Sequence, residues 1–282
     1  MIGVTGDTRP ASAIRSPDGL TALLWTAGLL TFAFIYLPVA VVIVYAFHDS
    51  PIIAWPLNLG TFRWFAALAH DRSMLEAALA SLKLALLAVA IAVLVGVPGA
   101  FVVDRLEFPG KTVFRRLVLL PLILPGIITG VALLTFFSFV GLSLSSGFPL
   151  VPGWPVVLGH AAALTSIVVT QVFAQLQRID RAQEEASQDL YATPWQTFRY
   201  VTFPNIRTAI LGAGLLVFTL SLDEIAVTFF LVGRQNTLPL HIWGLLRRGI
   251  TPEVNAAATI IFLLSVVVIV AWARLMRENT AA

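Results

Sequence analysis

Long uninterrupted apolar runs restrict the fold of this sequence more than any other feature. Several of them exceed the ~20 residues that an α-helix needs to cross a bilayer. The composition agrees, because 58% of the 282 residues are hydrophobic and only 12% are charged, about half the charged fraction of a soluble domain. The chain has no cysteine, which excludes disulfides and thiolate metal sites, and its histidines show no metal-ligand spacing. The sequence therefore predicts an all-α integral membrane protein without a metal site.

Six transmembrane helices are predicted, at about residues 20–47, 75–103, 113–140, 155–176, 206–232 and 254–276. The first run is too long for the apolar core of a signal peptide and lacks a small-residue cleavage site, so we expect it to be retained. The third span contains Pro121 and Pro125. We expect that helix to tolerate both prolines, because neighbouring helices can satisfy the freed carbonyls.

Lysine and arginine in the loops predict the orientation, since they are enriched on the cytoplasmic side. With the N-terminus inside, the inner segments carry more than twice as many of these residues as the outer loops. The inner set is Arg9, Arg15, Arg105, Lys111, Arg115, Arg116, Arg178, Arg181, Arg199, Arg207, Arg274 and Arg277. Both termini are therefore predicted to be cytoplasmic, with tails at 1–19 and 278–282. These arginines also explain the pI near 9.7, so we expect no nucleic-acid partner.

A charged insert interrupts the apolar pattern between the fourth and fifth spans, with the sequence EEASQDLYATPWQTFRYVTFPNIRTAI at residues 184–210. Asp180 can cap a first helix whose acids suit the helix dipole and which should end near Leu190. Thr193, with Pro194 and Gln196 after it, has the pattern of a second helix start. Pro204 is expected to restart the chain as the fifth span begins. The insert thus predicts two short helices joined by a turn, forming a rigid knob for a partner.

The insert resembles the EAA loop of ABC-transporter permeases, in which E-A-A is followed after three residues by Gly and after nine more by I-x-L-P. The matching positions here are Glu185, Ala186, Ser187, Tyr191, Val201, Phe203 and Pro204. The spacing from Glu185 to Pro204 is that of the pattern. Ser187, Tyr191, Val201 and Phe203 depart from it. Tyr191 matters most, because glycine permits a left-handed turn at little steric cost, whereas tyrosine makes that turn costlier. The sequence therefore leaves open whether the loop keeps this turn or has a different local geometry.

The resemblance implies a type I ABC importer permease fold over residues 20–277, with the EAA loop at about 178–206. In the family this loop fits a groove on a cytoplasmic ATPase subunit. By resemblance, the coupling residues are Glu184, Glu185, Ala186, Ser187, Asp189, Tyr191 and Pro204. The chain would then be a transport subunit and not an enzyme. ATP and Mg would be used by the partner ATPase, and no cofactor would be bound by this chain.

Several further stretches resemble the second permease subunit of spermidine/putrescine importers, among them YLPVAVVIVYAFHDS, LPLILPGIITGVAL and SLDEIAVTFFLVG. This resemblance implies import of a polyamine across a bacterial inner membrane. The implied partners are a homologous permease, two ATPase subunits, a periplasmic binding protein and membrane lipid. Relatives that move aminophosphonates, opines or ferric iron look similar, so these cargoes remain alternatives.

Asp223 and Glu224 lie in the fifth predicted span, where ionisable residues are costly and so mark functional sites. Either acid could meet an amine cargo after the cargo has lost its water. Adjacent helix positions point about 100° apart, so we do not expect both acids to face one cavity. The helix could also break near Ser221. A structural pair bonded to a neighbouring helix or to Lys83 is the other interpretation, and the sequence leaves both open.

An ATP site within the chain is excluded by the spacing around Lys111. The stretch EFPGKT ends like a phosphate-binding loop, but that motif requires glycine at the position of Arg105 and a preceding strand. Energy must therefore come from another polypeptide. An ion-coupled secondary transporter using Asp223 or Glu224 is a rival class, which the EAA spacing disfavours. An intramembrane enzyme ranks last, because no nucleophile, base or metal set converges.

Overall fold

The computed structural model describes residues 19–51, 55–146, 152–247, 249 and 251–280. The predicted cytoplasmic tail at 1–19 lies outside these residues apart from Gly19. The regular structure in the described part is helical, with one isolated β-bridge between His48 and Leu59, so the predicted all-α class is confirmed. The chain divides into two compact units, residues 1–68 with 250–282, and residues 69–249.

The first unit is built on two long helices, α1 (Gly19–Ala46) and α12 (Pro252–Thr280), which pack against each other. Most large apolar side chains of α1 are exposed, which suits a helix that faces lipid or another subunit. The loop after α1 is held by His48, whose backbone oxygen accepts from Trp64 Nε1 at 2.7 Å. The short helix α2 (Arg63–His70) follows this loop. Because α12 runs to Thr280, it extends into the predicted tail at 278–282.

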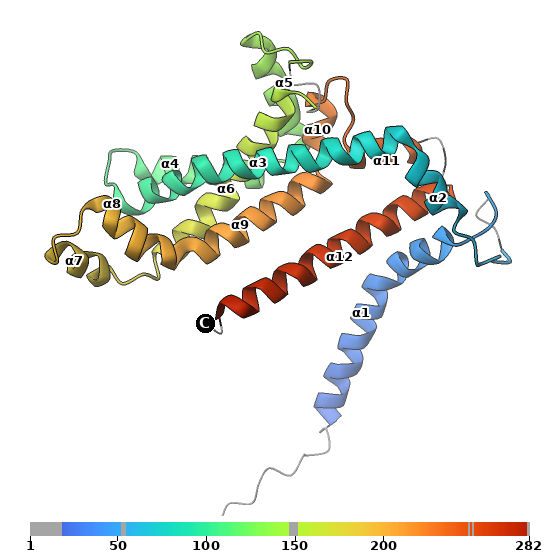
Figure 1. Cartoon of the computed structure of the whole chain (residues 1–282), viewed down its shortest axis with the longest axis horizontal. Coiled ribbons are helices and arrows are strands. Elements are labelled where there is room, and N and C mark those ends of the chain that lie inside the picture. Colours follow the sequence, from blue (N-terminus) through green and yellow to red (C-terminus); the bar gives the residue numbers. More distant parts are fainter. Residues whose placement is uncertain (1–18, 52–54, 147–151, 248, 250, 281–282) are drawn as a thin grey trace, which may run out of the picture. The chain divides into compact units, whose positions relative to one another are not determined.

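The second unit is centred on three long helices, α3 (Arg72–Arg105), α6 (Trp154–Leu176) and α9 (Phe203–Asp223), which pack against one another (Figure 1). Gly96 of α3 lies so close to α6 that a Cβ there would be 2.6 Å from Val168 Cβ. Small residues allow such close approach in membrane helices. The core they enclose consists of Ala92, Ala100, Val103, Val168, Val169, Val172, Leu176, Ile206, Ala213 and Val217.

The start of α3 is fixed by Asp71, whose carboxylate accepts hydrogen bonds from Ser73 N at 2.9 Å and Met74 N at 3.3 Å. This is the usual geometry of a helix N-cap. The Ser73 hydroxyl also donates to this carboxylate. This bond is the main reason why the pKa of Asp71 is lowered from its ordinary value. The long span therefore begins at a well-defined residue.

The third predicted span is broken. It forms α4 (Lys111–Ile123) and α5 (Gly126–Phe139), bent by 111° at the break. Our expectation that the helix would tolerate its prolines holds for Pro121, which lies inside α4, and is wrong for Pro125. Proline disfavours helical geometry in the residue before it. Leu124 accordingly has φ −71° and ψ 135°, which ends α4.

The fifth predicted span is broken as well. α9 ends at Asp223, and α10 (Ala226–Leu231) follows after Glu224 and Ile225. The break lies within three residues of Ser221, close to where the sequence allowed one. α10 packs on α5 and α6. The last helix of this unit, α11 (Leu238–Leu246), starts where Leu238 N donates to Ser81 Oγ of α3 at 2.7 Å.

Within the described residues, four helices are long and apolar enough to cross a membrane, and the bent α4–α5 pair makes five if it crosses once. The four are Thr21–Ala46, Arg72–Arg105, Trp154–Leu176 and Pro194–Asp223. In α12 the apolar stretch Pro252–Val267 is shorter than these. The chain is a multi-pass membrane protein, and the number six stays a prediction.

Candidate functional site

The charged insert forms a compact segment between α6 and α9. It contains α7 (Ala182–Asp189) and α8 (Pro194–Thr197). Asp180 Oδ1 accepts from Ala182 N at 3.0 Å, so this residue caps the first turn of α7 as predicted. The end near Leu190 is confirmed too, because α7 stops at Asp189. Thr193 and Gln196 form the predicted capping box, in which Thr193 N donates to Gln196 Oε1 at 2.7 Å.

Tyr191 occupies the left-handed turn after α7, with φ +62°. Tyr191 N donates to Gln188 O at 2.9 Å and Ala192 N donates to Ser187 O at 3.1 Å. This is the Schellman pattern, in which glycine normally takes the left-handed position. A side chain there costs roughly 1–2 kcal/mol relative to right-handed geometry. The left-handed turn is therefore formed with tyrosine in the place of glycine, and the backbone of Tyr191 is strained.

The chain does not restart at Pro204, and this expectation is wrong. α8 continues through the π-helical turn η1 (Phe198–Thr202) into α9, and Pro204 lies in the first turn of α9. A π turn pairs each amide with the carbonyl five residues earlier, and Phe203 N accordingly donates to Phe198 O. A proline inside a continuous helix removes one intrahelical hydrogen bond, and Pro204 directly follows the π turn, where the hydrogen-bond spacing already changes. The second short helix is thus continuous with α9.

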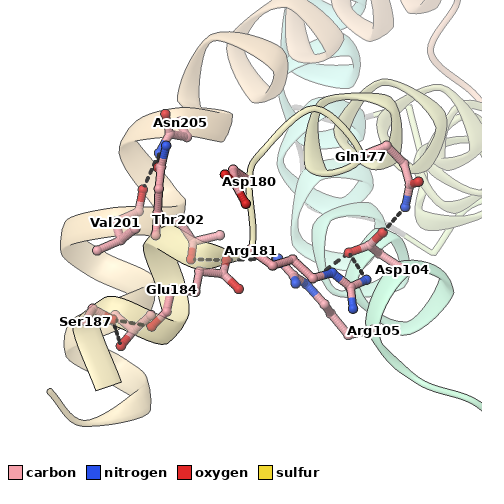
Figure 2. A network of polar contacts seen from close by, with 12 residues as sticks. Asp104, Arg105, Gln177, Asp180, Arg181, Glu184, Ser187, Val201, Thr202 and Asn205 are labelled. Atoms are coloured by element: carbon pink, nitrogen blue, oxygen red, sulfur yellow. Dashed lines mark hydrogen bonds and ion pairs between the residues drawn. The ribbon is translucent and has the colours of Figure 1, made fainter. Parts of the chain in front are cut away.

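An ion-pair network joins α7 to the end of α3 (Figure 2). Arg105 Nη2 lies 2.9 Å from Glu184 Oε1, and Thr202 Oγ1 donates to the same oxygen at 2.7 Å. Arg105 Nε also lies 2.9 Å from Asp104 Oδ2. The Asp104 side chain is 1% exposed and additionally accepts from Gln177 Nε2. Charge-assisted hydrogen bonds of this kind hold α7 against α3 and against η1.

Asp104 and Arg105 were not identified as site residues from the sequence. One signal was available, because an acidic residue in the last turn of a helix opposes the helix dipole. Asp104 lies in the last turn of α3, so its presence there needs another cause. The structure supplies that cause, since Arg105 and the more distant Arg181, 3.8 Å away, surround its carboxylate.

A cluster of aromatic rings gives the insert a second anchor on α3. Phe198 lies with its ring centroid 5.9 Å from that of Phe101 in α3. The Trp195 ring stacks on the Phe198 ring with 5.6 Å between their centroids, and the Phe203 ring centroid lies 6.1 Å from that of Phe198. Aromatic pairs in this range attract beyond the area that they bury. The insert is therefore fastened to α3 by apolar and ionic contacts together.

The seven coupling residues expected from the sequence divide into two groups. Glu184 and Ser187 point into the molecule, since Ser187 Oγ lies 2.8 Å from Thr197 Oγ1. The other five are exposed, namely Glu185, Ala186, Asp189, Tyr191 and Pro204. The inward residues can transmit a movement to the spans, while the outward ones are available to a partner.

The two acids of the fifth predicted span are brought to the break between α9 and α10, where they have different environments. Glu224 Oε1 accepts from Val227 N at 2.8 Å and so caps α10. Asp223 ends α9 and is exposed. No ion pair joins either acid to Lys83 among the residues that the structure describes. Glu224 thus fits the structural interpretation, because its carboxylate is bonded within the protein. The carboxylate of Asp223 is exposed and available to a cationic group.

His160 of α6 holds the two sides of this break together. Its Nδ1 lies 2.8 Å from Ser221 Oγ in α9, and its Nε2 lies 2.8 Å from Thr228 Oγ1 in α10. The residue is 1% exposed. His160 could not be placed near the acids from the sequence alone, because it lies 63 positions before Asp223. Its hydrogen bonds fix the positions from which Asp223 and Glu224 project.

Comparison with known proteins identifies the relatives of this chain. The sequence model of the family "Binding-protein-dependent transport system inner membrane component" matches residues 93–279. The Escherichia coli K12 putrescine transport system permease protein PotI is 35% identical over 270 residues, covering 94% of this chain and 93% of PotI. The spermidine/putrescine transport system permease protein PotC of the same strain is 31% identical over 261 residues, covering 91% and 96%.

The fold also matches a solved structure. A crystal structure of a bacterial ABC transporter involved in the import of the acidic polysaccharide alginate superposes with a TM-score of 0.65, covering 95% of this chain and 99% of that one. The sequence identity is 16%, so this likeness concerns the fold alone. The resemblance to ABC permeases inferred from the charged insert is confirmed by the family match and by the similarity to PotI and PotC.

Proposed function

The chain belongs to the family of binding-protein-dependent transport system inner membrane components and is a permease subunit of an ABC importer, and we propose that its cargo is a polyamine such as putrescine or spermidine. The observation that carries this proposal is the similarity to PotI and PotC over more than nine tenths of the chain. Family membership decides against the ion-coupled secondary transporter.

Asp223 supports a cationic cargo. Its carboxylate is exposed at the break between α9 and α10, whereas that of Glu224 is engaged with a backbone amide. A cargo amine that has lost its water needs an anionic partner of this kind. An opine or an aminophosphonate carries acidic groups that Asp223 would repel, so these alternatives are less favoured. Ferric iron would require further oxygen ligands.

The energy for transport is proposed to come from ATP bound with Mg by partner ATPase subunits. The insert with α7 and α8 would be the joint with one of these subunits. Glu184 would pass the movement of the joint to α3 through Arg105, and the continuous helix from Pro194 to Asp223 would pass it to the break beside Asp223. Asp223 and α8 of the joint thus lie on one continuous helix.

The proposed assembly contains this chain, a homologous permease, two ATPase subunits and a periplasmic binding protein in a bacterial inner membrane. Six spans with both termini in the cytoplasm would place the insert on the ATPase side and the loop between α10 and α11 on the binding-protein side. This arrangement agrees with the distribution of lysine and arginine in the sequence.

ATP-driven uptake tests the proposal. The complete importer, reconstituted in liposomes, is supplied with labelled putrescine and spermidine, beside a form carrying Asp223→Asn. We expect the native complex to accumulate polyamine, and the variant to lose at least tenfold in uptake while ATPase activity persists. Uptake by the native complex of another cargo, with no response to polyamines, would refute the polyamine assignment and leave the importer class intact.

A further inference from the structure

A pocket of about 380 Å³ lies beside the first turns of α3, apart from the sites described above. Its wall combines α3 with the segment that follows α10 and with α11, which packs on α3 (Figure 1). The volume is within the range of small-molecule sites. Two cationic side chains line the pocket, Lys83 from α3 and Arg234 from the segment between α10 and α11. Two positive charges from distant parts of the sequence thus share one pocket.

The polar groups of this pocket are incompletely paired. Neither Lys83 nor Arg234 has an ion-pair partner among the described residues. His241 of α11 also lines the pocket, and its buried Nε2 has no hydrogen-bond partner in the described part of the chain. Glu76, an acid of the same wall, is paired with Arg72 at 3.1 Å. Because a buried polar atom without a partner is costly, the pocket suits a ligand with negatively charged oxygens.

Lys83 lies at the depth of lipid headgroups. At the other end of α3, Arg105 is bonded to the charged insert, which must lie outside the hydrocarbon core because charged groups are costly there. Lys83 is 22 positions before Arg105. This separation corresponds to ~33 Å along the helix, against ~30 Å for the core. Lys83 therefore lies where the core meets the headgroups of the opposite leaflet, the periplasmic one in the proposed orientation.

An exposed apolar strip continues from Lys83 towards the middle of the membrane. Leu86 and Leu94 are 55% and 74% exposed, and Ala90 between them is exposed as well. Residues three or four positions apart lie on one face of a helix, so Lys83 and this strip form one line along α3. A molecule with a phosphate at Lys83 and an acyl chain along the strip fits both parts. A free phosphate fits only the first.

We propose that this pocket binds the headgroup of an anionic phospholipid, with the phosphate between Lys83 and Arg234. Arginine suits phosphate because its planar donors match the phosphate oxygens, and basic pockets between membrane helices bind lipid headgroups. A headgroup without an amine, such as that of phosphatidylglycerol, is favoured, since an ammonium group would be repelled by Arg234. The bound lipid would tie the segment between α10 and α11 to α3, which goes beyond the proposed transport function.

An acidic surface of another protein is the other partner that two cations can attract, and the depth of the pocket disfavours it. Lys83 lies at the edge of the hydrocarbon core, a level that the surface of a soluble protein does not reach. A soluble protein also supplies no acyl chain for the strip on α3. The two charges alone fit both partners, so the strip and the depth favour the lipid.

The experiment titrates phosphatidylglycerol onto the detergent-solubilised importer and counts bound lipid by native mass spectrometry. Lys83→Gln and Arg234→Gln should each weaken binding at one site about tenfold, the scale of a lost hydrogen bond to a charged group. Lys83→Arg keeps the charge and should stay within about threefold of the native affinity. Arg247→Gln is the matched control, because it removes an exposed cation at the end of α11 that does not line the pocket.

A photoactivatable phosphatidylglycerol locates the site in the same importer, held in nanodiscs. Its crosslinks should fall on residues 76–94 and disappear in the Lys83→Gln, Arg234→Gln double variant. Phosphatidylglycerol should also raise the unfolding temperature of the native importer more than that of the double variant, because a ligand stabilises the state that it binds. These measurements use neither cargo nor ATP, so their outcome is independent of the polyamine assignment.

Four results would overturn the inference. They are native crosslinking and affinity in both glutamine variants, an equal loss of affinity in Arg247→Gln, displacement of the lipid by inorganic phosphate in large excess, and a lower unfolding temperature of the double variant in phosphatidylcholine nanodiscs. The second would show a general attraction to positive charge, the third a site for a free anion, and the fourth a structural role. Unchanged lipid binding with weaker attachment of the periplasmic binding protein would assign the two cations to a protein contact instead.

Discussion

At the scale of single residues, His160 shows how one buried polar side chain can hold a broken span together. Both of its ring nitrogens are hydrogen-bonded, to hydroxyls that lie on opposite sides of the break. Removing the ring would cost Ser221 and Thr228 one hydrogen bond each. The buried Ser221 hydroxyl would lose the partner that the structure gives it, at about 1–3 kcal/mol, whereas Thr228 Oγ1 would still donate to Glu224 O at 2.8 Å. The break between α9 and α10, and Asp223 with it, therefore depends on a residue of α6.

We predict that His160→Ala destabilises the permease by about 2–4 kcal/mol, because it combines these losses with a cavity. Thr219→Ala in α9, close to the break, is the control, since the Thr219 hydroxyl is exposed and donates to Leu215 O of its own helix. Thermal unfolding of the detergent-solubilised importer measures both. Equal unfolding temperatures for the two variants would contradict the role assigned to His160.

At the scale of helices, the contact between Arg105 and Glu184 should determine how firmly α7 is held. The two side chains are only 22% and 16% exposed, so their pairing is stronger than that of a surface salt bridge. Arg105→Gln should weaken the attachment of α7 by about 1–3 kcal/mol, the range for hydrogen bonds to charged groups. The amides of Ala182–Asp189 should then exchange hydrogen roughly tenfold faster or more.

Hydrogen exchange followed by mass spectrometry tests this prediction on the assembled importer. Glu185→Gln is the matched comparison, because Glu185 follows Glu184 in the chain but points outward, and its substitution should leave α7 exchange unchanged. A second readout is the amount of cargo moved per ATP, which should fall in Arg105→Gln. Unchanged exchange in Arg105→Gln would show that the other contacts of the insert, among them Ser187 with Thr197 and the aromatic cluster at Phe198, hold α7 without this ion pair.

Local signals in the sequence predicted the elements well, and tertiary contacts decided where prediction failed. The caps at Asp180 and Thr193 were predictable because each involves residues a few positions apart. The two prolines show the limit. Pro125 ends a helix, whereas Pro204 is absorbed into one by the π turn before it. Both positions have the same local signal, so only the packing of the surrounding helices distinguishes them.

The candidate site was predictable to a similar extent. The EAA spacing identified the insert and drew attention to Tyr191, but whether tyrosine keeps the left-handed turn was left open until the structure showed φ +62° there. The partner of Glu184 was not predictable, since Arg105 lies 79 residues away. The different environments of Asp223 and Glu224 likewise depend on a helix break whose exact position the sequence did not fix.

At the scale of the whole molecule, the orientation of the insert tests how the chain crosses the membrane. α9 has 21 residues and is ~31 Å long, enough for a ~30 Å hydrocarbon core. Gln188 and Asn236, exposed on opposite sides of this span, should therefore lie on opposite sides of the membrane. With the N-terminus inside, Gln188 is cytoplasmic only if the bent α4–α5 pair crosses once.

The absence of native cysteine allows a direct measurement with single cysteines and a membrane-impermeant maleimide. We predict that Asn236→Cys reacts in intact spheroplasts and that Gln188→Cys reacts only after the cells are opened. Leu94→Cys is the control, since this residue is 74% exposed on α3 but should be shielded by lipid in both preparations.

Labelling of Gln188→Cys from outside, with Asn236→Cys protected, would mean that α4 and α5 form a re-entrant pair or that the N-terminus lies outside. Labelling of both from outside would mean that α9 does not cross, and the continuous element that links the insert to Asp223 could not then connect the two faces of the membrane.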